Sequence, residues 1–300
     1  MQKELTGDDL FSLIVLMRTN DSRAFLVLEG ESDMAALKGH IEGESCQAIP
    51  GYGKGAVLKA LSICEAQDVD RVAALVDRDW VGITKQADPI RNVFYTDYYD
   101  LDATILSIKP LRERVVTNLS NQQRLEAHLT RIGASEPIDV IIPAARLVAA
   151  IRHLCDSGLI VGSAKDFPID VIMDLDGGEP DDDKALELAM RRGGVRDPDP
   201  STARGDLADA LNKLPDGFTC CNGHDLARAL AHVLHKRWGA AALGGETIER
   251  VLRSAFSCLE LSTTRFRREL ADWGHQEGRK IWNCPQTEGS EQLLESGGSP

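Results

Sequence analysis

The features that constrain the fold of this chain most strongly are two short apolar segments, each of which is directly followed by acidic residues. Residues 24–28 read AFLVL and are followed by Glu29, and residues 71–76 end in AALV and are followed by Asp77 and Asp79. Five consecutive apolar residues are typical of a strand that is covered on both faces, as in a parallel sheet. Because open α/β sheets place their chemistry at the carboxyl ends of strands, the sequence predicts that these acids share a site.

The segments between and after these strands predict alternation of strands and helices. We expect a helix over 31–41, a strand over 46–50, a turn at Gly51–Gly55, a helix over 56–66 and a strand over 92–96. Strands that alternate with helices at this short spacing form a parallel sheet. The predicted fold class is therefore α/β, a parallel sheet flanked by helices.

After residue 101 the pattern becomes mostly helical. Apolar residues at helical spacing predict helices over 111–132, 144–155, 179–192, 205–214, 225–238, 246–256 and 262–273, with one strand over 166–174. We expect a metal-binding catalytic domain over 1–110 and a mainly helical domain for substrate or partner contacts over 111–283. Residues 284–300 are polar and rich in Gly and Ser, which is typical of a disordered tail.

The net charge and the cysteines indicate how the protein could bind nucleic acid and in which cellular compartment we expect it. A net charge of −13 argues against coating nucleic acid by electrostatics alone, although bound divalent ions would offset part of it at a site. The spacing of the seven cysteines predicts no disulfide framework, and we expect a reduced, cytoplasmic protein with no membrane association. Cys220 and Cys221 before His224 are interpreted as buried thiols and not as a zinc site, because adjacent cysteines rarely bind one tetrahedral ion.

The motifs within residues 24–80 resemble those of a Toprim domain, the phosphoryl-transfer module of primases, topoisomerases and nucleases of the OLD family. The matching residues are Glu29-Gly30 after one strand, Asp33 soon after, and Asp77-Arg-Asp79 after a later strand. The resemblance implies general acid or base work for Glu29, and Mg²⁺ or Mn²⁺ bound by Glu29, Asp77 and Asp79. Asp33 either binds metal indirectly or favours the helix N-terminus. The alternative is an unrelated α/β sheet with acidic loops.

Lys54 lies in the turn Gly51-Tyr-Gly-Lys-Gly55, before a predicted helix. Backbone N–H groups at a helix N-terminus could hold a substrate phosphate there, with Lys54 adding positive charge. The turn lacks the spacing of a Walker P-loop, so it does not predict ATP hydrolysis. OLD-type nucleases carry a similar Gly-Lys turn, and the alternative is a tight turn with a solvated lysine.

Two further stretches resemble Toprim proteins encoded beside ABC-type ATPases in phage-defence operons, including the effector subunit of PARIS-type systems. In residues 96–106, Asp102 stands where those proteins more often have Glu, and the resemblance implies a third metal ligand. Gly223-His224-Asp225-Leu226 resembles their C-terminal half. His224 either contacts substrate phosphate or serves as a cap or packing group, and Asp225 is a natural helix N-cap.

These observations predict a Mg²⁺-dependent endonuclease, and the resemblance implies that it acts as an effector of anti-phage defence by abortive infection. The resemblance implies that a partner ABC-type ATPase holds it inactive, and that on release it cleaves DNA or RNA, with transfer RNA the first candidate. A homodimer after release is a further expectation. The alternative is a non-enzymatic binding or regulatory subunit of an ATPase complex; an inactive relic is disfavoured because nothing structural requires three acids at these positions.

Two other charged features have simpler interpretations. Asp174-Leu-Asp176 also follows an apolar run, but its acids are interpreted as loop solvation and helix capping. A cationic group on C-terminal helices could contact a nucleic-acid backbone or an acidic partner, although a solvated helix face is the favoured interpretation of each side chain. Its members are Arg250, Arg253, Arg265, Arg267 and Arg268.

Overall fold

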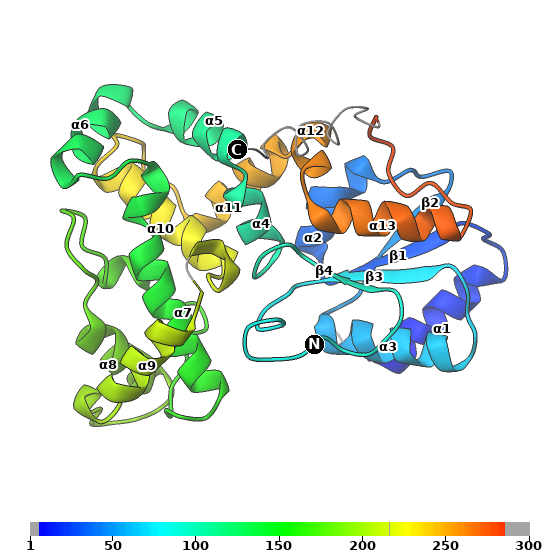
Figure 1. Ribbon diagram of the computed structural model, residues 1–300, viewed down its shortest axis with the longest axis horizontal. Coiled ribbons are helices and arrows are strands. Elements are labelled where there is room, and N and C mark those ends of the chain that lie inside the picture. Colours follow the sequence, from blue (N-terminus) through cyan, green and yellow to red (C-terminus); the bar gives the residue numbers. More distant parts are fainter. Residues whose placement is uncertain (1–5, 216, 286–300) are drawn as a thin grey trace, which may run out of the picture. The chain divides into compact units, whose positions relative to one another are not determined.

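The computed structural model describes residues 6–215 and 217–285, and these divide into two compact units (Figure 1). Described residues within 1–76, 89–95 and 256–300 form the first unit, and those within 77–88 and 96–255 form the second. Each unit is therefore assembled from separated stretches of the chain, whereas the sequence analysis placed one boundary near residue 110.

The first unit is built on a four-stranded parallel sheet. Its strands are β1 (Ala24–Leu28), β2 (Cys46–Pro50), β3 (Val72–Val76) and β4 (Val93–Tyr95), in the order β2-β1-β3-β4. All three pairings are parallel, and the register places Leu28 of β1 opposite Pro50 of β2 and Leu75 of β3. The predicted α/β class with a mostly helical C-terminal half is confirmed.

Helices cover both faces of this sheet. On one face, α1 (Gly7–Arg18) and α3 (Lys54–Ala66) pack on alternate strand residues such as Phe25 and Val27, which are fully buried. Figure 1 shows α2 (Glu31–Leu37) and α13 (Arg265–Gln276) on the opposite face. Since both faces are covered, β1 and β3 are buried at every position, which explains their uninterrupted apolar sequences.

The regular elements described in the second unit are helices. They are α4 (Leu101–Ser107), α5 (Lys109–Leu119), α6 (Gln122–Ile132), α7 (Ile142–Asp156), α8 (Asp182–Arg192), α9 (Arg204–Lys213), α10 (Gly223–Lys236) and α11 (Gly245–Ala255). Helix α10 is largely buried and packs against α4, α7 and α11. Short 3₁₀ turns lie at Lys38–His40 in the first unit and at Pro137–Val140, Ile169–Val171, Pro200–Thr202 and Gly217–Thr219 in the second.

Some predicted elements are wrong or divided. The strand expected over 166–174 is a 3₁₀ turn, in which Ile169 and Ile172 are buried three residues apart while Val171 is 40% exposed. The helix expected over 111–132 is two helices, because Asn121 caps α6 by accepting the Arg124 N–H at 3.1 Å. The helix expected over 262–273 corresponds to α13, which begins three residues later, at Arg265, and a short helix that was not predicted, α12 (Cys258–Ser262), precedes it.

One pair of cysteines forms a disulfide that the sequence analysis did not predict. Cys258 and Cys284 form a disulfide within the first unit, so the prediction of no disulfide framework is wrong for this pair. An antiparallel bridge between Ile41 and Trp282 brings Cys284 into place across a long stretch of sequence. Cys220 and Cys221 are buried thiols, as predicted. Cys284 is also buried, and the rest of the predicted tail, from residue 286, lies outside the described residues.

Candidate functional site

The edge of the sheet at the carboxyl ends of its strands holds Glu29, the residue predicted to act as general acid or base. Glu29 directly follows β1, and the neighbouring strand β3 is parallel and ends at Val76, to which Asp77 is bonded. The register places Leu28 beside Leu75, so the chain leaves both strands at the same edge. Glu29 is partly exposed, as a side chain that meets a ligand must be.

The glycine-rich turn after β2 closes over the end of β1. The Gly51 N–H donates to the carbonyl of Leu28 at 2.7 Å, and the Gly53 N–H donates to the carbonyl of Glu29 at 2.9 Å. A side chain at Gly51 would meet Val57 Cγ2 at 2.1 Å, so only glycine allows this close approach. Two of the amides expected to hold a phosphate are therefore bonded within the fold, and the turn instead fixes the backbone of Glu29.

Lys54 is the first residue of α3 and lies at the same edge, because β2 also ends there. Its ammonium lies 5.6 Å from the centre of the Tyr95 ring, a cation–π distance. The side chain is partly buried. A phosphate-binding role for Lys54 stays a prediction.

Asp33 lies in the first turn of α2. Its Oδ2 accepts the Gly30 N–H at 2.9 Å, so the side chain closes the turn that follows Glu29. Of the two roles predicted for Asp33, the helix N-terminal one is present in the structure. A metal-binding role in addition stays a prediction.

Asp77 and Asp79 belong to the second unit, where Asp77 bonds Leu101 through its side chain and Asp79 bonds Tyr99 through its backbone. Asp77 Oδ1 accepts the Leu101 N–H at 3.3 Å, and the Asp79 N–H donates to the Tyr99 carbonyl at 2.7 Å. Asp79 has a φ of 48°, in the left-handed region that non-glycine residues rarely adopt. That strain is often found where a side chain must be aimed at a ligand. The sharing of one ion by Glu29, Asp77 and Asp79 stays a prediction.

A second group of ionisable side chains lies wholly within the second unit. Asp102 of α4, His224 of α10 and Glu249 of α11 each offer a ligand atom, and these atoms lie within 4.8 Å of one another. Asp102 and His224 were predicted for separate roles, as metal ligand and phosphate contact, and the structure brings them together. The group could hold a metal ion.

Hydrogen bonds already connect this group. The Nδ1 of His224 lies 2.7 Å from Glu249 Oε1. Arg253, one turn after Glu249, pairs with both oxygens of Asp102 through Nε, at 2.7 Å, and through its terminal nitrogen. The same guanidinium reaches Glu249 at 3.4 Å. The two buried carboxylates, of Asp102 and Glu249, are therefore paired with the Arg253 guanidinium and the His224 imidazole.

The pKa values of the group follow from these contacts. The hydrogen bond to Glu249 raises the pKa of His224 to about 9. Burial, with the charge of Asp102 added to it, raises the pKa of the neighbouring Asp100 to about 7. Asp100 nonetheless accepts the N–H groups of Ala103 and Gly223, at 2.7 and 2.8 Å, which ties α4 to the start of α10.

Sequence reasoning missed Glu249, Arg253 as its counter-ion, and Asp100. A signal was present, since Glu249 and Arg253 lie four residues apart and each follows a buried residue of α11, Ile248 or Leu252. A charged pair beside the apolar stripe of a helix indicates a buried ion pair.

Asp225 was predicted as an N-cap, and this is wrong. Asn222 caps α10 by accepting the His224 N–H at 2.9 Å. Asp225 lies in the first turn of the helix, where its buried carboxylate pairs with Arg152 of α7 at 2.5 Å.

Asp174 and Asp176 lie in a loop, as the sequence analysis expected, and both make contacts within the fold. Asp174 accepts the backbone N–H of Asp176 at 2.7 Å, and Asp176 is paired with Arg131 and Arg237. The hydrogen bond from Arg131 lowers the pKa of Asp176.

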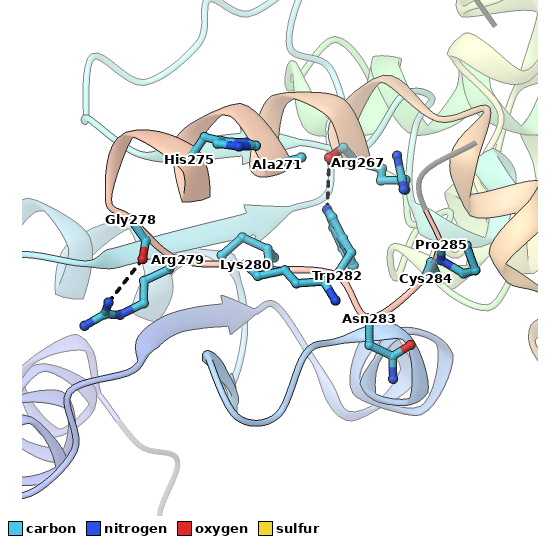
Figure 2. A pocket seen from close by; sticks show the side chains of 11 residues that line it. Arg267, Ala271, His275, Gly278, Arg279, Lys280, Trp282, Asn283, Cys284 and Pro285 are labelled. Atoms are coloured by element: carbon cyan, nitrogen blue, oxygen red, sulfur yellow. Dashed lines mark hydrogen bonds between the residues drawn. The ribbon is translucent and has the colours of Figure 1, made fainter. Parts of the chain in front are cut away.

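A cavity of about 680 Å³ lies in the first unit, between α13 and residues 278–285 (Figure 2). Its lining contains three cationic side chains and, among the described residues, no carboxylate: Arg267, Arg279 and Lys280. Lys280 is paired with Glu42, and Arg279 donates to the Ser22 carbonyl. The Nε of Arg267 is buried and has no hydrogen-bond partner among the described residues.

Comparison with known protein families finds no family that matches this chain, and comparison with curated proteins finds no match. Within the described ranges, 6–215 and 217–285, no helix is both long enough and apolar enough to span a bilayer. The assignment of function therefore depends on the residues themselves.

Proposed function

We propose that this chain is a metal-dependent phosphodiesterase that cleaves nucleic acid, with Glu29, Asp77 and Asp79 as its catalytic acids. The observation that carries the proposal is the parallel pairing of β1 with β3. Glu29 follows one of these neighbouring strands and Asp77 follows the other. Ligand sites of open α/β sheets lie at such strand ends.

The donor set of this site consists of carboxylate oxygens, and these are the ligands that Mg²⁺ and Mn²⁺ prefer. Bound there, the ion would activate a water molecule and offset charge on the phosphate. Glu29 would accept the proton of that water, and Asp77 and Asp79 would hold the ion. Lys54, at the same edge of the sheet, would contact a substrate phosphate.

The biological setting is proposed from the resemblance of residues 24–106 to Toprim effectors of phage defence. In that setting an ABC-type ATPase holds the chain inactive, and release permits cleavage of RNA or DNA, with transfer RNA as the first candidate. The helical second unit supplies more surface than a Toprim core requires. Co-expression with the ATPase of the native operon, followed by affinity purification, tests this part; a chain that elutes alone and is harmless when overproduced contradicts it.

Substitution Glu29→Gln tests the enzymatic proposal. The side chain keeps its size but loses its charge and its capacity to accept a proton, so we expect cleavage of transfer RNA or plasmid DNA in Mg²⁺ to fall by about 100-fold or more. Glu44→Gln is the matched control, because Glu44 is exposed in the same unit. Circular dichroism establishes that both variants fold. Undiminished cleavage by a folded Glu29→Gln protein contradicts the assignment.

The second candidate function is a non-enzymatic binding or regulatory subunit of an ATPase complex. The observation in its favour is the engagement of Asp102 by Arg253, because an ion-paired carboxylate contributes to structure without a metal. The two functions differ in one measurement. A purified complex that cleaves no nucleic acid under any activating condition, and whose ATPase rate changes with this subunit, favours the binding role.

A further inference from the structure

His40, Cys258 and Cys284 form a compact group in the first unit, and none of them belongs to the groups of acids discussed above. His40 Nδ1 lies 3.6 Å from Cys258 Sγ and 3.4 Å from Cys284 Sγ, and the two sulfurs are bonded to each other. The three residues come from distant parts of the sequence: the 3₁₀ turn after α2, the first turn of α12, and the segment after α13. We propose that, when the disulfide is reduced, these residues bind one Zn²⁺ ion.

The orientation of the imidazole supports a ligand role. Its other nitrogen, Nε2, lies 3.1 Å from the carbonyl oxygen of Phe256, which can only accept a hydrogen bond. The proton of a neutral His40 is therefore on Nε2, and the lone pair of Nδ1 is directed at the sulfurs. Metal-bound histidines are oriented in this way, by donating the second ring nitrogen to a carbonyl or carboxylate.

The distances also suit a tetrahedral ion. With Zn–S near 2.3 Å and Zn–N near 2.0–2.1 Å, the nitrogen and each sulfur of a tetrahedral site lie about 3.6 Å apart. The two distances from Nδ1 to sulfur, 3.6 and 3.4 Å, are already close to this value. Reduction frees the sulfurs to move to the separation of about 3.8 Å that the same geometry requires.

The backbone around the group is fixed independently of the sulfurs. The Asn283 N–H donates to the His40 carbonyl at 2.8 Å, and the Glu42 N–H donates to the Ile281 carbonyl at 2.8 Å. These bonds hold His40 beside Cys284, and the bond from His40 to the Phe256 carbonyl holds the segment that leads to Cys258, so the ligands stay close together after the disulfide is reduced. This pre-organisation lowers the conformational cost of binding an ion.

A fourth ligand position is available as well. Cys284 lines the cavity of about 680 Å³, near Trp282 and Pro285 (Figure 2). Three protein ligands and a water molecule form a common zinc arrangement. Thiolate ligands also favour Zn²⁺ over Mg²⁺, so this site and the carboxylate site would select different ions.

The two states of the site are related by a balanced exchange. A thiol reductant converts the disulfide to two thiols, which release two protons when Zn²⁺ binds. In the reverse direction, a small-molecule disulfide accepts two electrons from the thiolate pair and becomes two thiolates. The Cys258–Cys284 bond then forms and the ion leaves.

Metal substitution tests the proposal on the full chain. Protein reduced with a phosphine, freed of metal and held in excess Mg²⁺ is titrated with Co²⁺ and then with Zn²⁺. We expect one equivalent of Co²⁺ to produce a thiolate charge-transfer band that Zn²⁺ abolishes. Cys258→Ser and Cys284→Ser should lose the band, His40→Asn should weaken Zn²⁺ binding by at least about tenfold, and Cys155→Ser is the matched control.

A second readout uses the unaltered protein, in case a variant does not fold. Zn²⁺ should protect Cys258 and Cys284 from alkylation while leaving Cys155 reactive, as measured by mass spectrometry of peptides. Oxidised glutathione should then release one equivalent of zinc. Absence of the band in the reduced protein, equal alkylation of these cysteines with and without Zn²⁺, or full affinity in a folded His40→Asn variant overturns the proposal.

Discussion

At the scale of single residues, buried ion pairs decide where the acids of the second unit lie. Asp102 and Asp225 are both almost fully buried, and each is paired with an arginine from another helix, Arg253 and Arg152 respectively. A buried carboxylate without a counter-ion is strongly destabilising. The acids of α4 and α10 therefore serve the packing of helices, whatever further role Asp102 has.

Arg152→Met should destabilise the second unit by about 3–5 kcal/mol, because it leaves the charge of Asp225 buried without its partner. The double variant Arg152→Met/Asp225→Leu should recover most of that loss, since it removes both charges and keeps apolar volume. Urea unfolding of the wild type and of both variants measures the difference. A single variant as stable as the wild type contradicts the inferred pairing.

The stability of the second unit should also depend on pH through His224. Its hydrogen bond to Glu249 raises its pKa from 6.5 to about 9, so the stabilisation is fully present below pH 6.5 and is lost as the pH rises through about 9. More than half of the side chain is exposed, so the effect is small. Urea midpoints measured across this range should fall less steeply for His224→Gln; identical slopes for both proteins contradict the assignment.

At the scale of elements, the glycine turn between β2 and α3 shows how a local sequence fixes a site. Gly51 approaches β1 so closely that its amide bonds the Leu28 carbonyl, and Gly53 adopts a φ of 103°. The turn thereby joins the ends of two strands at the edge where Glu29 lies. Its glycines are explained by these backbone contacts, and the phosphate role expected from the sequence stays a prediction.

Gly51→Ala should destabilise the first unit by about 1–3 kcal/mol, because the added methyl group would overlap Val57 Cγ2 and the Leu28 carbonyl. Gly55→Ala is the matched control: nothing lies within 4 Å of its added methyl group, and α3 should gain about 0.5–1 kcal/mol. Thermal unfolding of the two variants should shift in opposite directions. Shifts of the same sign would show that the close approach is absent.

At the scale of the whole molecule, the first unit depends on both ends of the chain. The segment from Phe256 onward returns to it and buries Phe266, Leu270, Trp273 and Trp282. Residues near the C-terminus therefore complete a domain whose strands all lie within the first 95 residues.

Truncation after Ala255 should therefore leave the sheet unit unable to fold stably. It removes α12 and α13 and exposes the apolar residues that they cover, a loss of several buried side chains at about 1.5–3 kcal/mol each. The control is a chain truncated after Pro285, which keeps α12, α13 and the segment that follows them. Soluble yield and thermal unfolding distinguish the two chains, and equal stability would contradict the two-part construction of the first unit.

The sequence by itself determined the sheet and the placement of its acids. β1 and β2 have the predicted bounds, and β3 differs by one residue. β1 and β3 are buried on both faces, which requires uninterrupted apolar runs. The position of Glu29 after β1 and of Asp77 after β3 follows from the same runs. These features are local, so a pattern of a few residues is sufficient to predict them.

Only the tertiary structure decided which distant residues meet. The grouping of Asp102 with His224 and Glu249, the pairing of Asp225 with Arg152, and the disulfide beside His40 join segments far apart in the chain. Residues 166–174 form a turn and not a strand because Ile169 and Ile172 are buried on the same side. Such contacts depend on how helices pack around one another, and no short stretch of sequence carries that information.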